Sequence, residues 1–265
     1  MTIELFLIFL LIFVSSSFIK GWSGFGTNLI AMPILASVLG YPLDVSVTIV
    51  VSVNIFMNVA ILLENKKFNI KSLEHIKVLV FFGVVFTFVG ALLLKSPDNA
   101  DALKVIAGCI IVLTAIYRIL ITFFTITFEI NEKHLHHYFI PVGIISGFFN
   151  GIAGLGGLPV LILLSNSSMK RDTFRTTIVS YFLVMNIVAI IGYLLAGTFT
   201  TFVGISIGLM IIPSILFCLL GVWLSRRVSD KLFSRVMLFV LLFMGLNLII
   251  NGLYHTSIIS FIFSS

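Results

Sequence analysis

Charged residues are scarce in this chain, and their scarcity excludes a soluble protein. They make up 10% of its 265 residues, whereas 60% of the residues are apolar. A soluble domain carries about 25% charged residues, so this chain has too little polar surface to face water. The alternating pattern of membrane strands is also missing. Apolar runs of about 20 residues recur instead, which is the length that crosses a bilayer. The composition therefore predicts an all-α polytopic membrane protein that contacts the lipid bilayer.

Cysteines, metal-binding patterns and buried acids are equally sparse. The chain has two cysteines, both in apolar segments, and no Cys/His cluster with metal-ligand spacing. We interpret the three histidines of one polar loop as part of a solvated connector: His134, His136 and His137. The acidic residues next to apolar segments lie at segment ends, which gives no support to a proton relay: Glu4, Asp44, Glu64 and Asp172. We expect no metal, no cofactor and, without a basic domain outside the bilayer, no nucleic acid partner.

The chain contains an internal repeat. SSFIKGWSGFG at residues 16–26 resembles SGFFNGIAGLG at 146–156, with equivalent residues 130 positions apart. Downstream, TIVVSVNIFMN at 48–58 resembles TTIVSYFLVMN at 176–186, with an offset of 128. Internal repeats of this size in a membrane protein are typical of transporters.

Each repeat holds five apolar segments. In the first half they cover residues 3–19, 28–40, 44–63, 76–94 and 103–124. In the second half they cover residues 138–151, 158–168, 173–196, 199–224 and 232–253. We therefore predict a first transmembrane repeat at 1–125, a cytoplasmic connector at 126–137 and a second transmembrane repeat at 138–265.

The positive charges predict how the repeats are oriented. When the connecting lysines and arginines are assigned to alternate sides of the membrane, and Lys20 is set aside, thirteen fall on one side and two on the other. The positive-inside rule makes the first side cytoplasmic and leaves both termini outside. Because five segments is an odd number, the two halves enter the membrane in opposite senses. The chain is thus expected to form two inverted five-segment repeats.

The glycine-rich motif lies between the first two segments of each half. In the second half these segments have about 14 and 11 residues, and they rise about 21 and 16 Å, which is too short for a bilayer core of about 30 Å. We expect re-entrant or broken helical hairpins whose tips meet near the midplane. The longer first hairpin either spans fully or is re-entrant. Transporters of this type bind their substrate at the interface between the repeats.

The residues of the two tips are suited to an anion. Glycines let a ligand approach the backbone, and the helix after each tip presents free N–H groups and a positive dipole end. The predicted substrate-binding residues are Lys20, Ser23, Gly24, Gly26, Thr27, Asn28, Asn150, Gly154, Gly156 and Gly157, with Asn54, Ser180 and Arg175 from the third segments. No catalytic residue is predicted. Two alternatives stay open: tight helix packing by the small residues, and a Lys20 side chain that reaches the cytoplasm.

Two signature regions carry a resemblance to a known family. GFGTNLIAMPIL in the first half, and GIAGLGGLPVLILL with FRTTIVSYFLVMN in the second, resemble those of the TauE/SafE sulfite exporter family. The resemblance covers essentially the whole chain. It implies a prokaryotic plasma (inner) membrane transporter of small sulfur-containing anions: sulfite, sulfoacetate and related organosulfonates.

We therefore predict a secondary transporter, an exporter working by alternating access, that is not an enzyme. The alternatives are an intramembrane enzyme, which needs a catalytic pair facing the cavity, and a non-transporting scaffold, which gives no reason to duplicate a polar tip. A homo-oligomer is compatible with each of these functions.

The predicted topology can be tested by cysteine labelling. Cysteines introduced at Ser72 and Ser229 should react with an impermeant thiol reagent only from the cytoplasm, and one at Asn99 only from outside. Labelling of positions 72 and 99 from the same side would contradict the inverted arrangement.

Overall fold

The computed structural model describes most of the chain, and the described part is helical without strands. The described residues are 2–24, 26–64, 71–94, 100–124, 136–165, 171–225, 242–243 and 245–254. The helices are α1 (Ile3–Ser23), α2 (Thr27–Pro33), the π-helical turn η1 (Ile34–Val38), α3 (Leu43–Glu64), α4 (Lys71–Glu74), α5 (Lys77–Leu93), α6 (Ala100–Phe124), α7 (Phe139–Ala153), α8 (Gly157–Ser165), α9 (Arg171–Leu195) and α10 (Thr201–Ser225). Residues 245–254 are also helical. Most of the predicted connector 126–137, and positions 99 and 229, lie outside the described residues.

Four of these helices are long and apolar enough to cross a membrane: Ile3–Trp22, Leu43–Glu64, Thr173–Leu195 and Thr201–Ser225. Large apolar side chains cover their outward faces, for example Leu11 on α1, Leu195 on α9 and Ile212 on α10. Such faces suit contact with lipid tails, which are as apolar as leucine. The prediction of an all-helical membrane protein is confirmed.

The repeat glycines end the first helix of each half. Gly24 follows α1 with a φ of 84°, and its N–H donates to the carbonyl of Lys20 at 2.7 Å. Gly154 follows α7 with a φ of 67°, and its N–H donates to the carbonyl of Asn150 at 2.8 Å. A left-handed residue at this position satisfies the last carbonyls of a helix, and glycine adopts that conformation without steric cost. The repeated motif therefore encodes two equivalent helix ends.

Three of the four helices that flank the tips are too short to span a bilayer core. The apolar helix Thr27–Val38, which joins α2 to η1, rises about 18 Å. α7, with 15 residues, rises about 22 Å, and α8, with 9 residues, about 14 Å. The fourth, α1, has 21 residues and is long enough to cross.

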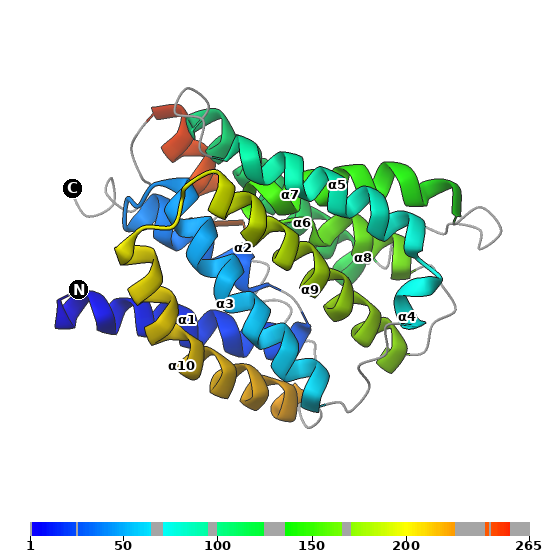
Figure 1. The fold of residues 1–265 in the computed structure, drawn as a ribbon, viewed down its shortest axis with the longest axis horizontal. Coiled ribbons are helices and arrows are strands. Elements are labelled where there is room, and N and C mark those ends of the chain that lie inside the picture. Colours follow the sequence, from blue (N-terminus) through cyan, green and yellow to red (C-terminus); the bar gives the residue numbers. More distant parts are fainter. Residues whose placement is uncertain are drawn as a thin grey trace.

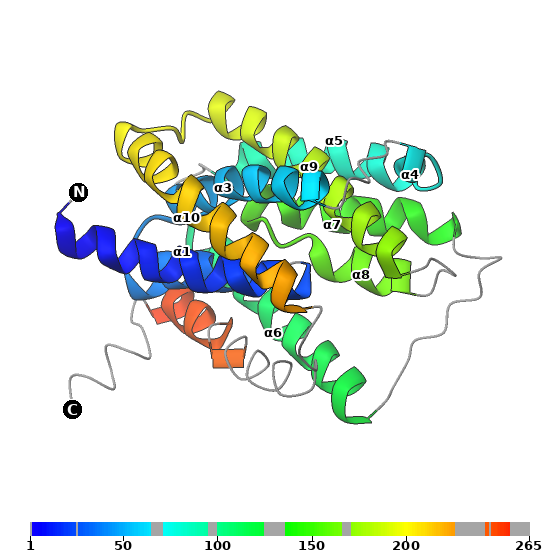
Figure 2. The same cartoon turned by 90° about the horizontal axis from the view of Figure 1, so that it is seen from below.

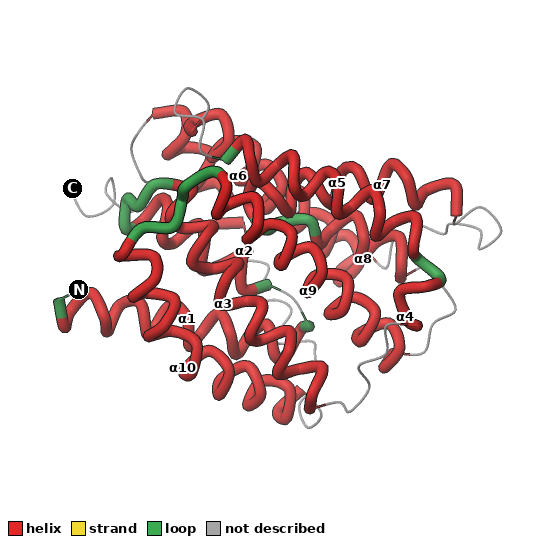
Figure 3. Tube along the Cα trace, in the orientation of Figure 1, coloured by secondary structure: helices red, strands yellow, loops and turns green. Residues whose placement is uncertain are grey.

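The two hairpins enter the molecule from opposite ends of its long axis. α1 starts at the N-terminus on the left of the view and α2 returns toward that end, whereas α7 and α8 occupy the right (Figures 1 and 2). The short loops at the two tips lie inside the bundle, away from its ends (Figure 3). Non-helical backbone at this depth is tolerated where protein or a water-filled cavity covers it.

The helices of the two halves pack across each other. α1 lies along α10, and α5 lies along α7; these are the most extensive contacts between described helices. α3 contacts both α9 and α10, while α9 also contacts α5 (Figure 1). The first helix of each half thus packs on the helix of the fourth apolar segment of the other half.

Equivalent glycines make both of these crossings close. A methyl group added to Gly21 would overlap the carbonyl oxygen of Cys218, and one added to Gly221 would overlap that of Phe18. In the other crossing, methyl groups on Gly151 and Gly90 would overlap the carbonyls of Thr87 and Phe148. Gly151 and Phe148 follow Gly21 and Phe18 by 130 positions, and Gly221 and Cys218 follow Gly90 and Thr87 by 131.

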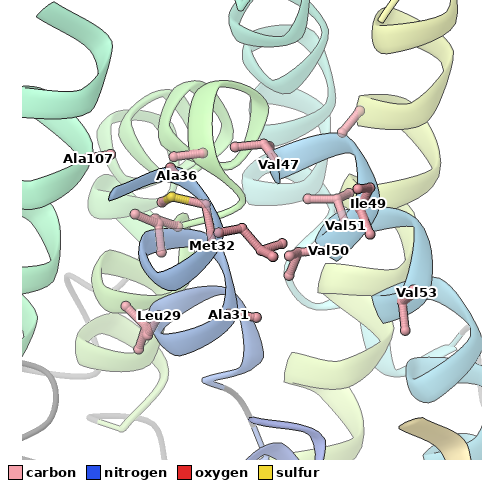
Figure 4. Packing of buried hydrophobic residues seen from close by; sticks show 14 of the residues in the cluster. Leu29, Ala31, Met32, Ala36, Val47, Ile49, Val50, Val51, Val53 and Ala107 are labelled. Atoms are coloured by element: carbon pink, nitrogen blue, oxygen red, sulfur yellow. The ribbon is translucent and has the colours of Figure 1, made fainter. Parts of the chain in front are cut away.

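The apolar core holds the first tip helix against α3. Met32 and Ala36 of α2 and η1 lie between Val47 and Val50 of α3 on one side and Ala107 of α6 on the other (Figure 4). Met32 and Val50 are fully buried. This packing fixes the position of Thr27 and Asn28, the first residues of α2.

The close crossing of α1 and α10 gives a test of the fold. Gly221→Ala should destabilise the protein by about 1–3 kcal/mol, because the added methyl group forces the two helices apart. Gly208→Ala, on the same helix, is the control, because nothing lies within 4 Å of the methyl group it adds. Thermal unfolding of the purified protein in detergent measures both. Equal melting temperatures for the two variants would contradict the close crossing.

Candidate functional site

The two glycine tips are in direct contact. The Nδ2 of Asn28, at the start of α2, donates to the carbonyl oxygen of Gly154 at 2.6 Å. A methyl group on Gly154 would overlap this amide nitrogen. Gly154 therefore meets two requirements, a positive φ and a close approach by the other tip. The two halves of the repeat, whose tips are 130 residues apart in sequence, are joined at this point.

A chain of hydrogen bonds connects Lys20 to this contact. The ammonium of Lys20, on the last turn of α1, donates to Oδ1 of Asn54 on α3. The amide nitrogen of Asn54 in turn donates to Oδ1 of Asn28. Lys20 is only 5% exposed. Its side chain thus points into the protein. Of the two predicted placements, at the tips or at the cytoplasmic surface, the structure shows the one at the tips.

A cavity opens between the two tips. It contains about 540 Å³ of empty space, counting its open mouth. The residues that line it come from both tips and from α3, α6 and α9: Lys20, Gly24, Gly26, Thr27, Asn28, Leu29, Asn54, Asn58, Thr114, Asn150, Gly154, Leu155, Gly157, Leu158, Phe182 and Asn186. Lys20 is the one charged side chain in this set, and no acidic residue offsets it there.

Several buried polar atoms at the cavity have no hydrogen-bond partner among the described residues. They are Nδ2 of Asn58, Oγ1 of Thr27 and Oδ1 of Asn150. These side chains are at most 1% exposed. Because buried polar groups in folded proteins are almost always hydrogen-bonded, such a cluster indicates a place for a polar ligand or for water. The amide of Asn150 also donates to Oδ1 of Asn186 at 3.5 Å.

Most of the predicted site residues lie at this cavity. The structure brings nine of them together in its lining: Lys20, Gly24, Gly26, Thr27, Asn28, Asn54, Asn150, Gly154 and Gly157. Ser23 is the last residue of α1, and its side chain lies outside the described part of the chain.

Three other predicted residues are placed elsewhere. Gly156 packs within the second hairpin, where its carbonyl accepts a hydrogen bond from Oγ of Ser146 at 2.6 Å. Arg175, near the start of α9, donates from Nη2 to the carbonyl of Gly21 at 2.6 Å, beside the first tip. Ser180 is buried in α9 and is not part of the cavity lining.

The cavity also contains several residues outside the predicted substrate-binding set. Asn58 and Asn186 occupy equivalent positions of the repeat, and as polar residues within membrane spans they are weaker candidates for a functional cavity from the sequence. Thr114 is an isolated polar residue in an apolar segment, and its hydroxyl also donates to the carbonyl of Ile110. Phe182 and Leu158 belong to the lining as well. A search for polar residues does not find such apolar contributions.

The described residues contain no group of three or more His, Cys, Asp or Glu side chains that could hold a metal ion. The cavity lining offers amide, hydroxyl and ammonium groups. The amides and hydroxyls both donate and accept hydrogen bonds, so it is the positive charge of the Lys20 ammonium that suits an anion more than a cation.

Comparison with known proteins assigns a family to nearly the whole chain. The family model described as "Sulfite exporter TauE/SafE" matches residues 8–248. No curated protein and no solved structure matches the chain significantly.

The contact between the tips can be tested with two matched glycines. Gly154 and Gly40 have φ values of 67° and 71°, so alanine at either position costs about 1–2 kcal/mol for the left-handed conformation. Only Gly154→Ala also displaces Asn28, because nothing lies within 4 Å of a methyl group on Gly40. We expect Gly154→Ala to lower the melting temperature clearly more than Gly40→Ala. Equal losses in the two variants would show that the tips do not touch.

Proposed function

The chain belongs to the sulfite exporter TauE/SafE family, and on this basis we propose that it carries a small sulfur-containing anion through the cavity between its two tips. The family makes it a multi-pass membrane transport protein for sulfite or a related anion. The observation that carries the proposed site is the buried ammonium of Lys20, which faces a cavity with no acidic residue in its described lining. An isolated buried charge is costly, and a bound anion would offset that cost.

The substrate's oxygens would be bound by groups from both halves. Lys20 supplies a charge-assisted hydrogen bond. Thr27 and Asn58 supply donors that lack partners within the described residues. The N–H groups at the start of α8, beside Gly157, add a positive dipole end. Sulfite and sulfonates present three oxygens around one sulfur, so several convergent donors are a suitable match.

Arg175 would assist from the edge of the site. Its guanidinium bonds the carbonyl of Gly21 near the end of α1, next to the first tip. A fixed positive charge there raises the local concentration of anions at the entrance to the cavity. Arg175 therefore acts on the approach of the substrate, whereas Lys20 acts on its binding.

Alternating access of two inverted halves is the proposed mechanism. Hairpins that enter from opposite ends of the molecule support it (Figures 1 and 2). The equivalent glycine crossings of α1 with α10 and of α7 with α5 also support it. In such folds one half rocks against the other, so that a fixed midplane site opens first to one side and then to the other.

The membrane potential favours the outward direction. An anion that leaves a cell with an inside-negative potential gains about 2.3 kcal/mol per charge per 100 mV. Export therefore needs no coupling ion. We propose that the protein works in a prokaryotic plasma membrane with both termini outside, as the thirteen-to-two distribution of positive charges predicts.

An enzymatic function has less support. The described cavity lining contains no carboxylate, histidine or cysteine. It therefore lacks the acid–base or nucleophile–base pairs that hydrolytic enzymes use. A scaffold has no use for a buried cation or for a duplicated polar tip.

Binding and efflux of anions test the proposal. Calorimetry with the wild-type protein should detect binding of at least one of sulfite, sulfoacetate and propane-1-sulfonate. The anion that binds most tightly should leave proteoliposomes that contain the protein faster than it leaves vesicles without protein. Lys20→Gln should weaken binding about tenfold or more, because a hydrogen bond to a charged group contributes about 1.5–3 kcal/mol. It should also reduce the dependence of affinity on salt.

The matched control is Lys104→Gln. Lys104 pairs with Asp101 at 3.3 Å and is not part of the cavity lining. This variant should bind and transport like the wild type. If Lys20→Gln retains full affinity, Lys20 has no place in the site, and if the wild-type protein moves none of these anions, the proposed function is wrong.

A further inference from the structure

The two halves of the cavity are equivalent in sequence position but opposite in chemistry. Lys20, Asn28 and Asn54 form the hydrogen-bonded chain of the first half. Their equivalents in the second half, by the offsets of 130 and 128, are Asn150, Leu158 and Phe182. The cation is replaced by an amide, and the two bonded asparagines are replaced by two apolar side chains. All six residues line the cavity.

Phe182 holds the position at the second tip that Asn54 holds at the first. Asn54 reaches the second residue of α2 through its bond to Asn28. Phe182 reaches the first residue of α8: its Cζ lies 3.5 Å from the place of a Cβ on Gly157. Leu158 follows in the same helix, and Leu155 precedes it at the tip. The second half therefore contributes an apolar wall beside its own helix start.

The charge of the cavity sets the charge of its ligand. One ammonium faces the cavity, and the described lining contains neither a second cation nor an acid. A monovalent anion makes this site neutral. A divalent anion leaves one negative charge without a partner in the lining, which is unfavourable in a largely buried space, since Arg175 lies outside the lining and donates to the carbonyl of Gly21.

We propose that the ligand is a monovalent organic anion with a short apolar group. Its charged head lies at Lys20, Thr27 and Asn28, and its apolar group lies against Phe182 and Leu158. This inference rests on the proposed function and narrows it: bare sulfite lacks the apolar group, and sulfoacetate carries a second charge. Phe182 is then the residue that selects for the apolar group. The head is a sulfonate, because the proposed function requires a sulfur-containing anion and the three oxygens of a sulfonate can accept hydrogen bonds from several donors at once.

A chain-length series tests the apolar wall on the purified full chain. Calorimetry would compare methane-, ethane- and propane-1-sulfonate, the carboxylates acetate, propanoate and butanoate, and the anions sulfite and sulfoacetate. Burial of one methylene is expected to tighten binding about fourfold, so propane-1-sulfonate should bind about fifteenfold more tightly than methanesulfonate. A gain of this size in the sulfonate series supports the proposal, and a gain in the carboxylate series alone would contradict the sulfonate head.

Two variants of Phe182 assign the gain to its ring. Phe182→Asn, which introduces the residue found at the equivalent position of the first half, should reduce the gain per methylene to less than twofold. Phe182→Leu keeps an apolar side chain and should preserve most of the gain. If Phe182→Asn does not fold, Leu158→Thr takes its place. The gain per methylene in that variant is then compared with the gain in the wild-type protein.

The binding measurements distinguish a failure of the proposed ligand from a failure of the proposed anion transport. If sulfite or sulfoacetate binds the wild-type protein as tightly as propane-1-sulfonate, or if neither series shows a gain with chain length, the apolar wall does not select the ligand. Anion transport would then stand without this inference. If none of the anions binds, the proposed function fails with it.

Discussion

The arrangement of the tips depends on one buried positive charge. Lys20 lies 5% exposed at the end of an apolar helix, and it donates to Asn54, which donates to Asn28. Asn28 in turn donates a hydrogen bond to the carbonyl oxygen of Gly154 in the other half. A lysine in this position must be solvated by the protein, since lipid tails cannot do it. The amides of Asn54 and Asn28 solvate the ammonium in part. The cavity beside them leaves room for an anion that would complete its solvation.

The repeat explains how this site is built from helices that are otherwise apolar. The same glycine pattern ends α1 and α7 with a left-handed cap, and a second helix, α2 or α8, starts just beyond each of these ends. The same close crossings tie α1 to α10 and α7 to α5. Equivalent positions of the repeat thus carry different side chains, and in the proposed binding mode the difference between Asn54 and Phe182 would orient the ligand within the cavity.

Sequence patterns predicted the helices and the two tips well, because apolar length and repeated glycines are local features. They left the position of Lys20 open, since a lysine near a helix end can reach the interface as easily as a cavity; the contact with Asn54 comes from tertiary packing. Gly156 was assigned to the ligand but packs against Ser146, and Ser180 is buried away from the cavity. Phe182 was missed because its place in the cavity lining depends on tertiary packing, and its type alone resembles core packing.

Anomalous diffraction from crystals grown with 3-bromopropane-1-sulfonate would show how the ligand lies in the cavity, because the bromine marks one end of it. We expect a sulfonate oxygen about 3 Å from the ammonium of Lys20. The bromine should lie within about 4–4.5 Å of the ring of Phe182. A bromine peak on the Lys20 side of the cavity, or a bound sulfonate only outside the cavity between the tips, would contradict this binding mode.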